Sequence, residues 1–224
     1  LFLPHFLAVM TLAAVKGLEP ASHPPIRYLD IDIRVGEPQE VAPGILLLRL
    51  PLPFALNHIN VYLLDEGDGW TLVDCGLETR ISRETWEAVL ASPLLGGRPI
   101  SRVVVTHHHP DHIGLAGWLC RRFDAPLLMT QGEFGVAGRY ADPNRDVVSE
   151  RMDFWREHGL PQELSTWLME RMPRYSRHVH ELPGQVIAID PGQPLELGGW
   201  RWRPLIGRGH SPEHLSLFCD EEGL

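Results

Sequence analysis

The 224-residue sequence predicts an α/β fold, an αββα sandwich in which two mixed sheets pack together and helices flank them. Short apolar and β-branched runs alternate with segments of helical periodicity, and Pro and Gly turns separate them. The strands fall into two sets, one in each half of the chain, which indicates two sheets. A hydrophobic content of 44% is enough to bury the core of one good-sized domain.

The individual elements follow from these patterns. In the first half we expect strands at 45–50, 59–64, 71–74, 102–106 and 126–129, with a helix at 82–91. A further helix should begin just after the last of the polar residues at 107–112, because the sequence there becomes apolar and periodic. In the second half we expect strands at 186–189, 195–197, 200–206 and 215–219.

Two segments do not fit this simple alternation. Residues 131–184 form a longer connection than the fold needs, and helical spacing recurs around Trp155 and again around Trp167. We therefore predict an inserted helical hairpin within a domain that spans residues 41–224. Residues 1–40 are predicted to be a leader or an irregular N-terminal segment.

The segment Thr-His-His-His-Pro-Asp-His-Ile-Gly, at residues 106–114, directly follows an apolar strand. So many polar side chains at the end of a buried strand are costly to desolvate unless a cation compensates them. Residues two apart in an extended segment point the same way, so His107 and His109 can converge on one ion. Asp111 and His112 lie on the following turn and could serve a second ion about 3.5 to 4 Å away.

This pattern resembles the His-x-His-x-Asp-His signature of the metallo-β-lactamase fold superfamily, and in particular its hydroxyacylglutathione hydrolase-like metallohydrolases. Residues 59–64 and 71–76 are similar to the family's opening hairpin and its Asp-x-Gly motif. The Gly-His at 209–210 is similar to the segment that supplies the family's third histidine. The resemblance covers residues 42–224, and three motifs in the right order are far more specific than one.

The resemblance implies a ligand set for two zinc ions. His107, His109 and His210 are expected to bind the first ion, and Asp111 and His112 to help bind the second. Asp111 is also the expected catalytic residue, which orients the attacking hydroxide or accepts its proton. Iron remains a possible alternative to zinc.

Other residues are expected to support the centre. The resemblance suggests that Asp74 holds a ligand imidazole in the correct tautomer and that His214 has a supporting or structural role. The inserted hairpin could form a substrate wall or lid, to which Tyr140, Tyr175 or His178 would contribute substrate contacts.

One departure from the family pattern affects the second ion. The family normally supplies a bridging Asp soon after the third histidine and a further His near the end of the fold, and neither is found in this sequence. Asp220 lies in an expected turn, and we do not assign it the bridging role. We therefore expect the αββα fold to be incomplete at its C-terminus, with the two missing ligands beyond Leu224.

The expected reaction is hydrolysis of an ester-like bond by a zinc-bound hydroxide, because zinc lowers the pKa of a bound water to about 7. The resemblance makes thioesters, lactones and other small acyl esters the leading substrates of this thioesterase-like enzyme. A mononuclear iron dioxygenase of the same fold that oxidises sulfur compounds or persulfides is an alternative. Another alternative is that the chain is a non-catalytic, truncated remnant of such an enzyme.

The composition of the chain argues against some classes of binding partner. A net charge of −9 with a pI near 5.7 argues against binding to nucleic acid, which depends on clustered Lys and Arg. The apolar residues 1–15 are too short to span a bilayer, so no membrane partner is expected. Three widely spaced cysteines give no disulfide framework, so we expect a cytoplasmic protein, with export as the minority alternative. The oligomeric state remains open.

Overall fold

The computed structural model describes residues 31–142, 144–145, 147–171, 175–179 and 181–224. Contacts divide the chain into two units, Leu1–Ile31 and Asp32–Leu224, and the second contains all the helices and strands described below. Residues 1–30 of the predicted leader lie outside the described residues, whereas its last two residues already belong to the first strand.

The larger sheet contains seven strands, which follow one another in space in the same order as in sequence. The first four are antiparallel neighbours and the last four are parallel, so the sheet is mixed. Its strands are β1 (Gln39–Ala42), β2 (Ile45–Pro51), β3 (His58–Asp65), β4 (Trp70–Val73), β5 (Ile100–Val104), β6 (Leu127–Met129) and β7 (Ile187–Ala188).

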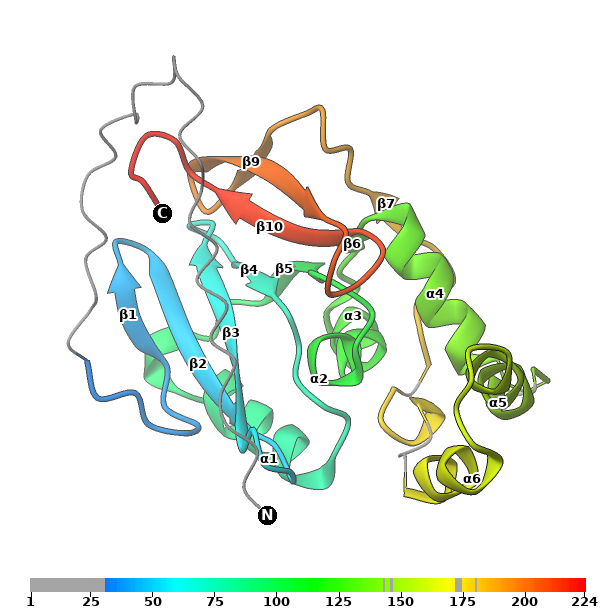
Figure 1. Cartoon of the computed structure of the whole chain (residues 1–224). Coiled ribbons are helices and arrows are strands. Elements are labelled where there is room, and N and C mark those ends of the chain that lie inside the picture. The colour runs from blue at the N-terminus through cyan, green and yellow to red at the C-terminus, as the bar shows by residue number, and fades with distance from the viewer. Residues whose placement is uncertain (1–30, 143, 146, 172–174, 180) are drawn as a thin grey trace, which may run out of the picture. The chain divides into compact units, whose positions relative to one another are not determined.

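The smaller sheet contains β8 (Leu195–Leu197), β9 (Trp200–Gly207) and β10 (His214–Phe218), all antiparallel, in the order β10-β9-β8. In Figure 1, β9 and β10 lie on one side of the larger sheet, and α2 and α3 lie on the other. The predicted arrangement of two sheets flanked by helices is therefore confirmed.

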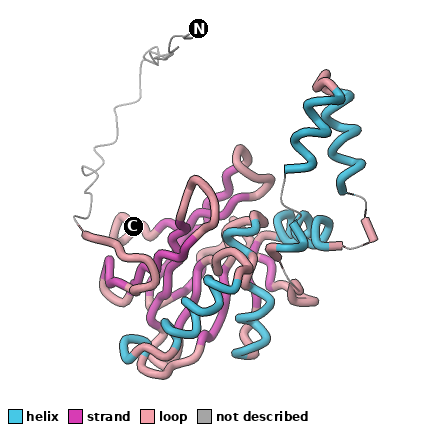
Figure 2. Tube along the Cα trace, turned by 90° about the horizontal axis from the view of Figure 1, so that it is seen from below, coloured by secondary structure: helices cyan, strands magenta, loops and turns pink. Residues whose placement is uncertain are grey.

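Helices follow most of the parallel strands. They are α1 (Arg80–Leu90), α2 (Pro110–Ile113), α3 (Ala116–Phe123), α4 (Gln131–Ala141), α5 (Val147–Glu157) and α6 (Gln162–Arg171), with short 3₁₀ helices at Pro93–Leu95 and Tyr175–Arg177. In the long segment 131–184, α5 and α6 lie side by side (Figure 2), and α4 precedes this pair. Among the described residues, no helix is both long and apolar enough to cross a lipid bilayer.

The central strands of the larger sheet are buried on both faces. Neighbouring residues on its central strands belong to different clusters, as Val103 and Val104 on β5 show. Val103 packs in the cluster that contains Trp86 of α1, and Val104 packs in the cluster that contains Trp202 of the smaller sheet. This double burial explains why successive residues such as Val103 and Val104, or the three residues of β6, are all apolar and do not alternate with polar residues.

The parallel strands also place polar residues at one edge. Because β4, β5 and β6 run in the same direction, Asp74, Thr106 and Thr130, which follow them, lie at the same end of the sheet. The smaller sheet is joined to this edge where the Leu215 N–H donates to the Thr106 carbonyl at 2.9 Å. The loop between β9 and β10 therefore lies close to the end of β5.

Candidate metal centre

Three histidine rings converge at this edge, although one of them is about a hundred residues from the other two. The distances are 3.0 Å between His107 Nε2 and His109 Nδ1, 3.0 Å between His109 Nδ1 and His210 Nε2, and 3.0 Å between His210 Nε2 and His107 Nε2. Three ring nitrogens thus form a nearly equilateral triangle. We call these three residues the histidine triad.

The histidine triad fits a zinc ion in two respects. A tetrahedral zinc ion holds nitrogen ligands at about 2.0–2.1 Å, which separates any two of them by about 3.3 Å, close to the distances in the triangle. Each neutral imidazole has one lone pair and one N–H, so three nitrogens whose lone pairs face one another are well placed to bind one cation. Three histidines also leave a fourth position open, as catalytic zinc sites do.

The rings of His107 and His109 are neutral at physiological pH. Burial above all, followed by the neighbouring His112 and His109, lowers the pKa of His107 to about 2. Burial, followed by His108 and His210, lowers the pKa of His109 to about 4. Their nitrogens are therefore available as ligands at pH 7 without the removal of a proton.

Asp74 holds the polar residues at the ends of β4 and β5 together. Its backbone has φ 63°, a left-handed conformation that Asp tolerates better than most residues, and the residue is buried. Asp74 Oδ1 accepts the Thr106 N–H at 2.8 Å, and Oδ2 accepts His112 Nδ1–H at 2.7 Å. With its proton on Nδ1, His112 has the lone pair of Nε2 available to a metal ion.

The Thr106 hydroxyl extends this arrangement to the histidine triad. It donates to Asp74 Oδ2 at 2.9 Å, so it is an acceptor for His107 Nδ1, which lies 3.0 Å away. With its proton on Nδ1, His107 presents the lone pair of Nε2 to the triangle.

The residues expected at a second ion lie beside the triad. The ring centroids of His107 and His112 are 4.0 Å apart, and Asp111 Oδ2 lies 3.5 Å from His112 Nε2. Burial, the largest influence on His112, lowers its pKa, but the hydrogen bond and the charges of Asp74 and Asp111 outweigh it and raise the pKa overall. The structure therefore provides one nitrogen and one carboxylate for a second ion.

Asp74→Asn tests the orientation of His112. Asn tolerates the left-handed backbone, and its oxygen can still accept the Thr106 N–H, but its amide then presents a donor to His112 Nδ1 and favours the opposite tautomer. We expect about 10- to 100-fold weaker binding of a second zinc ion, measured by titration of the metal-free protein. Unchanged binding of two ions would show that Asp74 does not orient His112.

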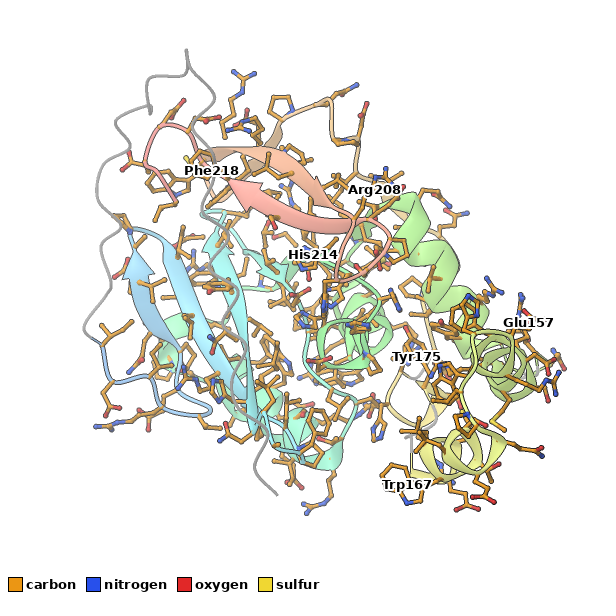
Figure 3. The ribbon with its side chains drawn as sticks, in the orientation of Figure 1. Glu157, Trp167, Tyr175, Arg208, His214 and Phe218 are labelled. Carbon is orange, nitrogen blue, oxygen red and sulfur yellow. The ribbon has the colours of Figure 1, made fainter. Side chains whose placement is uncertain are left out.

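His214 lies at the start of β10, next to the centre (Figure 3). Its ring centroid is 4.8 Å from that of His107 and 5.8 Å from that of His210. It thus packs beside two members of the triad, in the position expected for a supporting residue.

Two of the three residues predicted to contact substrate, Tyr140 and Tyr175, lie beside His108. The Tyr175 hydroxyl donates to the His108 carbonyl at 2.7 Å, and the Tyr140 ring lies 5.7 Å from the His108 ring. The His178 carbonyl accepts the Glu78 N–H at 3.2 Å, so this residue supports the loop before α1. Asp220 lies apart from the centre, because Arg203 binds both of its oxygens on the surface.

The sequence analysis did not identify Glu133, which is fully buried at the beginning of α4. The side chain of His108, between the first two triad residues, contacts Glu133 Oε2 through Nδ1 at 2.6 Å. An acidic residue in the first turn of a helix is common on protein surfaces, where it interacts favourably with the helix dipole, so no local signal distinguished this one.

The chain is similar to a known protein family and to several known proteins. The sequence model of the metallo-beta-lactamase superfamily matches residues 55–224. Two probable metallo-hydrolases from Bacillus subtilis (strain 168) are similar to most of the chain. YqjP is 28% identical over 188 residues, with 80% of this chain and 54% of YqjP covered. YflN is 27% identical over 190 residues, with 84% and 64% covered.

Two solved structures are also similar. A beta-lactamase domain protein from Burkholderia ambifaria has a TM-score of 0.72 and 37% identity, with 86% of this chain and 56% of that chain covered. The metallo-beta-lactamase family protein TTHA1429 from Thermus thermophilus has a TM-score of 0.67 and 30% identity, with 82% and 58% covered. The chain thus spans between about half and two thirds of the length of these relatives.

Proposed function

The chain belongs to the metallo-β-lactamase superfamily, and from this premise we propose that it is a zinc-dependent hydrolase of ester-like bonds. The observation that carries the proposal is the triangle of ring nitrogens formed by His107, His109 and His210. The similarity to proteins named probable metallo-hydrolases supports the same reaction class.

The proposed mechanism assigns a role to each residue near the triangle. Zinc bound by three histidines lowers the pKa of a water ligand to about 7 and so supplies a hydroxide nucleophile near neutral pH. The triad would hold the ion through the three ring nitrogens that face one another. The Asp111 carboxylate would accept the proton and orient the nucleophile, and the Nε2 atom of His112, which Asp74 orients through Nδ1, lies 3.5 Å from that carboxylate.

The proposed substrates are small acyl compounds, namely thioesters, lactones and other esters. The net charge of −9 is unfavourable for a polyanionic substrate such as nucleic acid. A panel of thioesters, lactones and phosphodiesters, assayed with the zinc-loaded protein, tests this proposal. We expect hydrolysis of an acyl ester that a chelator abolishes and that zinc restores.

The same assay separates the alternatives. A mononuclear iron dioxygenase typically binds its ion through two histidines and one carboxylate, whereas three nitrogens converge here. Oxygen uptake with one iron per chain and a persulfide substrate would contradict the hydrolase proposal. A protein that binds zinc at the triad but hydrolyses nothing in the panel would support the non-catalytic remnant.

A further inference from the structure

Glu133 is a fully buried carboxylate that the proposed mechanism does not use. It is the third residue of α4, which begins directly after Thr130 at the end of β6. From this position its two oxygens reach two segments that are far apart in the sequence. These are the segment that carries His107 and His109 and the segment that carries His210.

One oxygen fixes the first segment. Glu133 Oε2 accepts the backbone N–H of His108 at 3.0 Å and is 2.6 Å from Nδ1 of the same residue. His108 lies between His107 and His109, so these two bonds restrain the backbone that carries both ligands. The Tyr175 hydroxyl restrains the same residue from the other side through its carbonyl at 2.7 Å.

The other oxygen fixes the second segment. Glu133 Oε1 accepts the backbone N–H of Glu213 at 2.6 Å, three residues after His210. The interaction is reciprocal, because Glu213 Oε2 accepts the N–H of Gly132 at 2.8 Å. The Thr130 hydroxyl donates to the Glu213 carbonyl at 3.2 Å. We call Thr130, Gly132 and Glu133, with their partners His108 and Glu213, the α4 clasp.

The surroundings keep Glu133 ionised despite its burial. Burial raises its pKa, but the hydrogen bonds from Glu213 and His108 outweigh this effect and lower the pKa overall. A buried carboxylate that accepts several N–H bonds is expensive to leave unpaired, so the bonds to both segments tend to form or break together. Arg208 is the first residue of the β9–β10 loop and lies near α4 (Figure 3). Its guanidinium is 3.6 Å from Oε1 of Glu213, the last residue of that loop.

We propose that Glu133 is a positioning residue of the metal centre, which holds His210 against His107 and His109 by joining their two segments at α4. The inference rests on the proposed metal site, because its function is to place those ligands. Without the clasp, the 210–214 loop keeps its bond from Leu215 to Thr106 but loses its attachment to α4. The triad then has to be assembled by the metal itself, which lowers the affinity for the metal.

Glu133→Gln is the first test. The amide preserves the shape but has one acceptor oxygen, so its NH₂ group must face an N–H of either His108 or Glu213. We expect the zinc affinity, measured by competition with a chelator, to fall about 10- to 100-fold. Val89→Ala is the matched control, because Val89 is buried on α1 and lies outside the clasp. This control should lower the unfolding midpoint without changing the zinc affinity.

Gly132→Ala tests the reciprocal half of the clasp without removing any polar group. A Cβ atom at Gly132 would lie 2.4 Å from Glu213 Oε2, so the carboxylate must leave the helix N-terminus. A Cβ atom at Gly135, one turn further along α4, meets nothing within 4 Å. Alanine favours a helix over glycine at both positions, so Gly135→Ala is the matched control. We expect about a tenfold loss of zinc affinity for Gly132→Ala and none for Gly135→Ala.

A measurement on the metal-free protein separates this inference from the proposed function. In Glu133→Gln, hydrogen exchange should become faster at the amides of both His108 and Glu213, whereas in Val89→Ala these two amides should change no more than the rest of the core. Wild-type zinc affinity in both Glu133→Gln and Gly132→Ala, or a loss equal to that of Val89→Ala, would overturn the clasp. If the wild-type protein bound no zinc, the proposed function would fail, and unchanged exchange at the two amides would refute the clasp independently.

Discussion

His109→Ala is expected to weaken zinc binding at the first site by about 10²- to 10³-fold. Structural zinc sites bind with an apparent free energy of about 10–16 kcal/mol, so one of three or four ligands accounts for about 3–4 kcal/mol. His109 Nδ1 lies 3.0 Å from the facing nitrogens of both His107 and His210, so its loss removes one corner of the triangle. Competition with a chelator measures the affinity, and any zinc-dependent ester hydrolysis should fall with it.

His158→Ala is the control for this substitution. His158 is exposed after α5, and its ring contacts the carbonyl of Phe154 in the same segment. Its replacement should leave the zinc affinity within twofold of the wild-type value. Equal zinc affinities for the His109→Ala and wild-type proteins would show that the ion binds elsewhere.

Trp86→Ala is expected to lower the free energy of unfolding by about 3–5 kcal/mol, as is typical when a large buried aromatic side chain is removed. Trp86 is fully buried on α1, in the cluster between the helices and the larger sheet. Its indole N–H donates to the Cys75 carbonyl at 2.9 Å, and the Cys75 N–H donates to the His112 carbonyl at 2.8 Å. The same substitution therefore loosens the backbone that carries Asp74 and His112.

Urea denaturation of the metal-free protein measures this effect. Domains of this size are typically stable by about 5–15 kcal/mol, so a loss of about 3–5 kcal/mol is large but can still be measured. Trp167→Ala is the control, because Trp167 on α6 is 50% exposed and its loss should cost much less. A loss below about 1 kcal/mol for Trp86→Ala would contradict the core described here.

The strands of the larger sheet could be predicted from sequence because most of them are buried on both faces. Continuous apolar runs such as Ile45 to Leu48 leave few alternatives once turns delimit them. β1 was not predicted, because this edge strand contains Gln39 and Glu40 and has no buried residue. α4 was not distinguished within the inserted segment, because Gly132, Gly135 and Gly138 lower its intrinsic helix propensity.

The candidate ligands could be predicted for a different reason. The spacing of His107, His109, Asp111 and His112 is itself a geometric pattern, and the order of motifs pointed to His210. Glu133 has no such pattern, because its partners are backbone groups of His108 and Glu213, 25 and 80 residues away. Only the packing of α4 against the two ligand segments reveals its contacts.

The central claim is that histidines from two distant segments bind one metal ion. A crystal structure of the zinc-loaded protein, with anomalous diffraction measured at the zinc absorption edge, tests it directly. We predict a peak within bonding distance of Nε2 of His107, Nδ1 of His109 and Nε2 of His210. A zinc ion bound without His210, or a peak away from this edge of the sheet, would contradict the account.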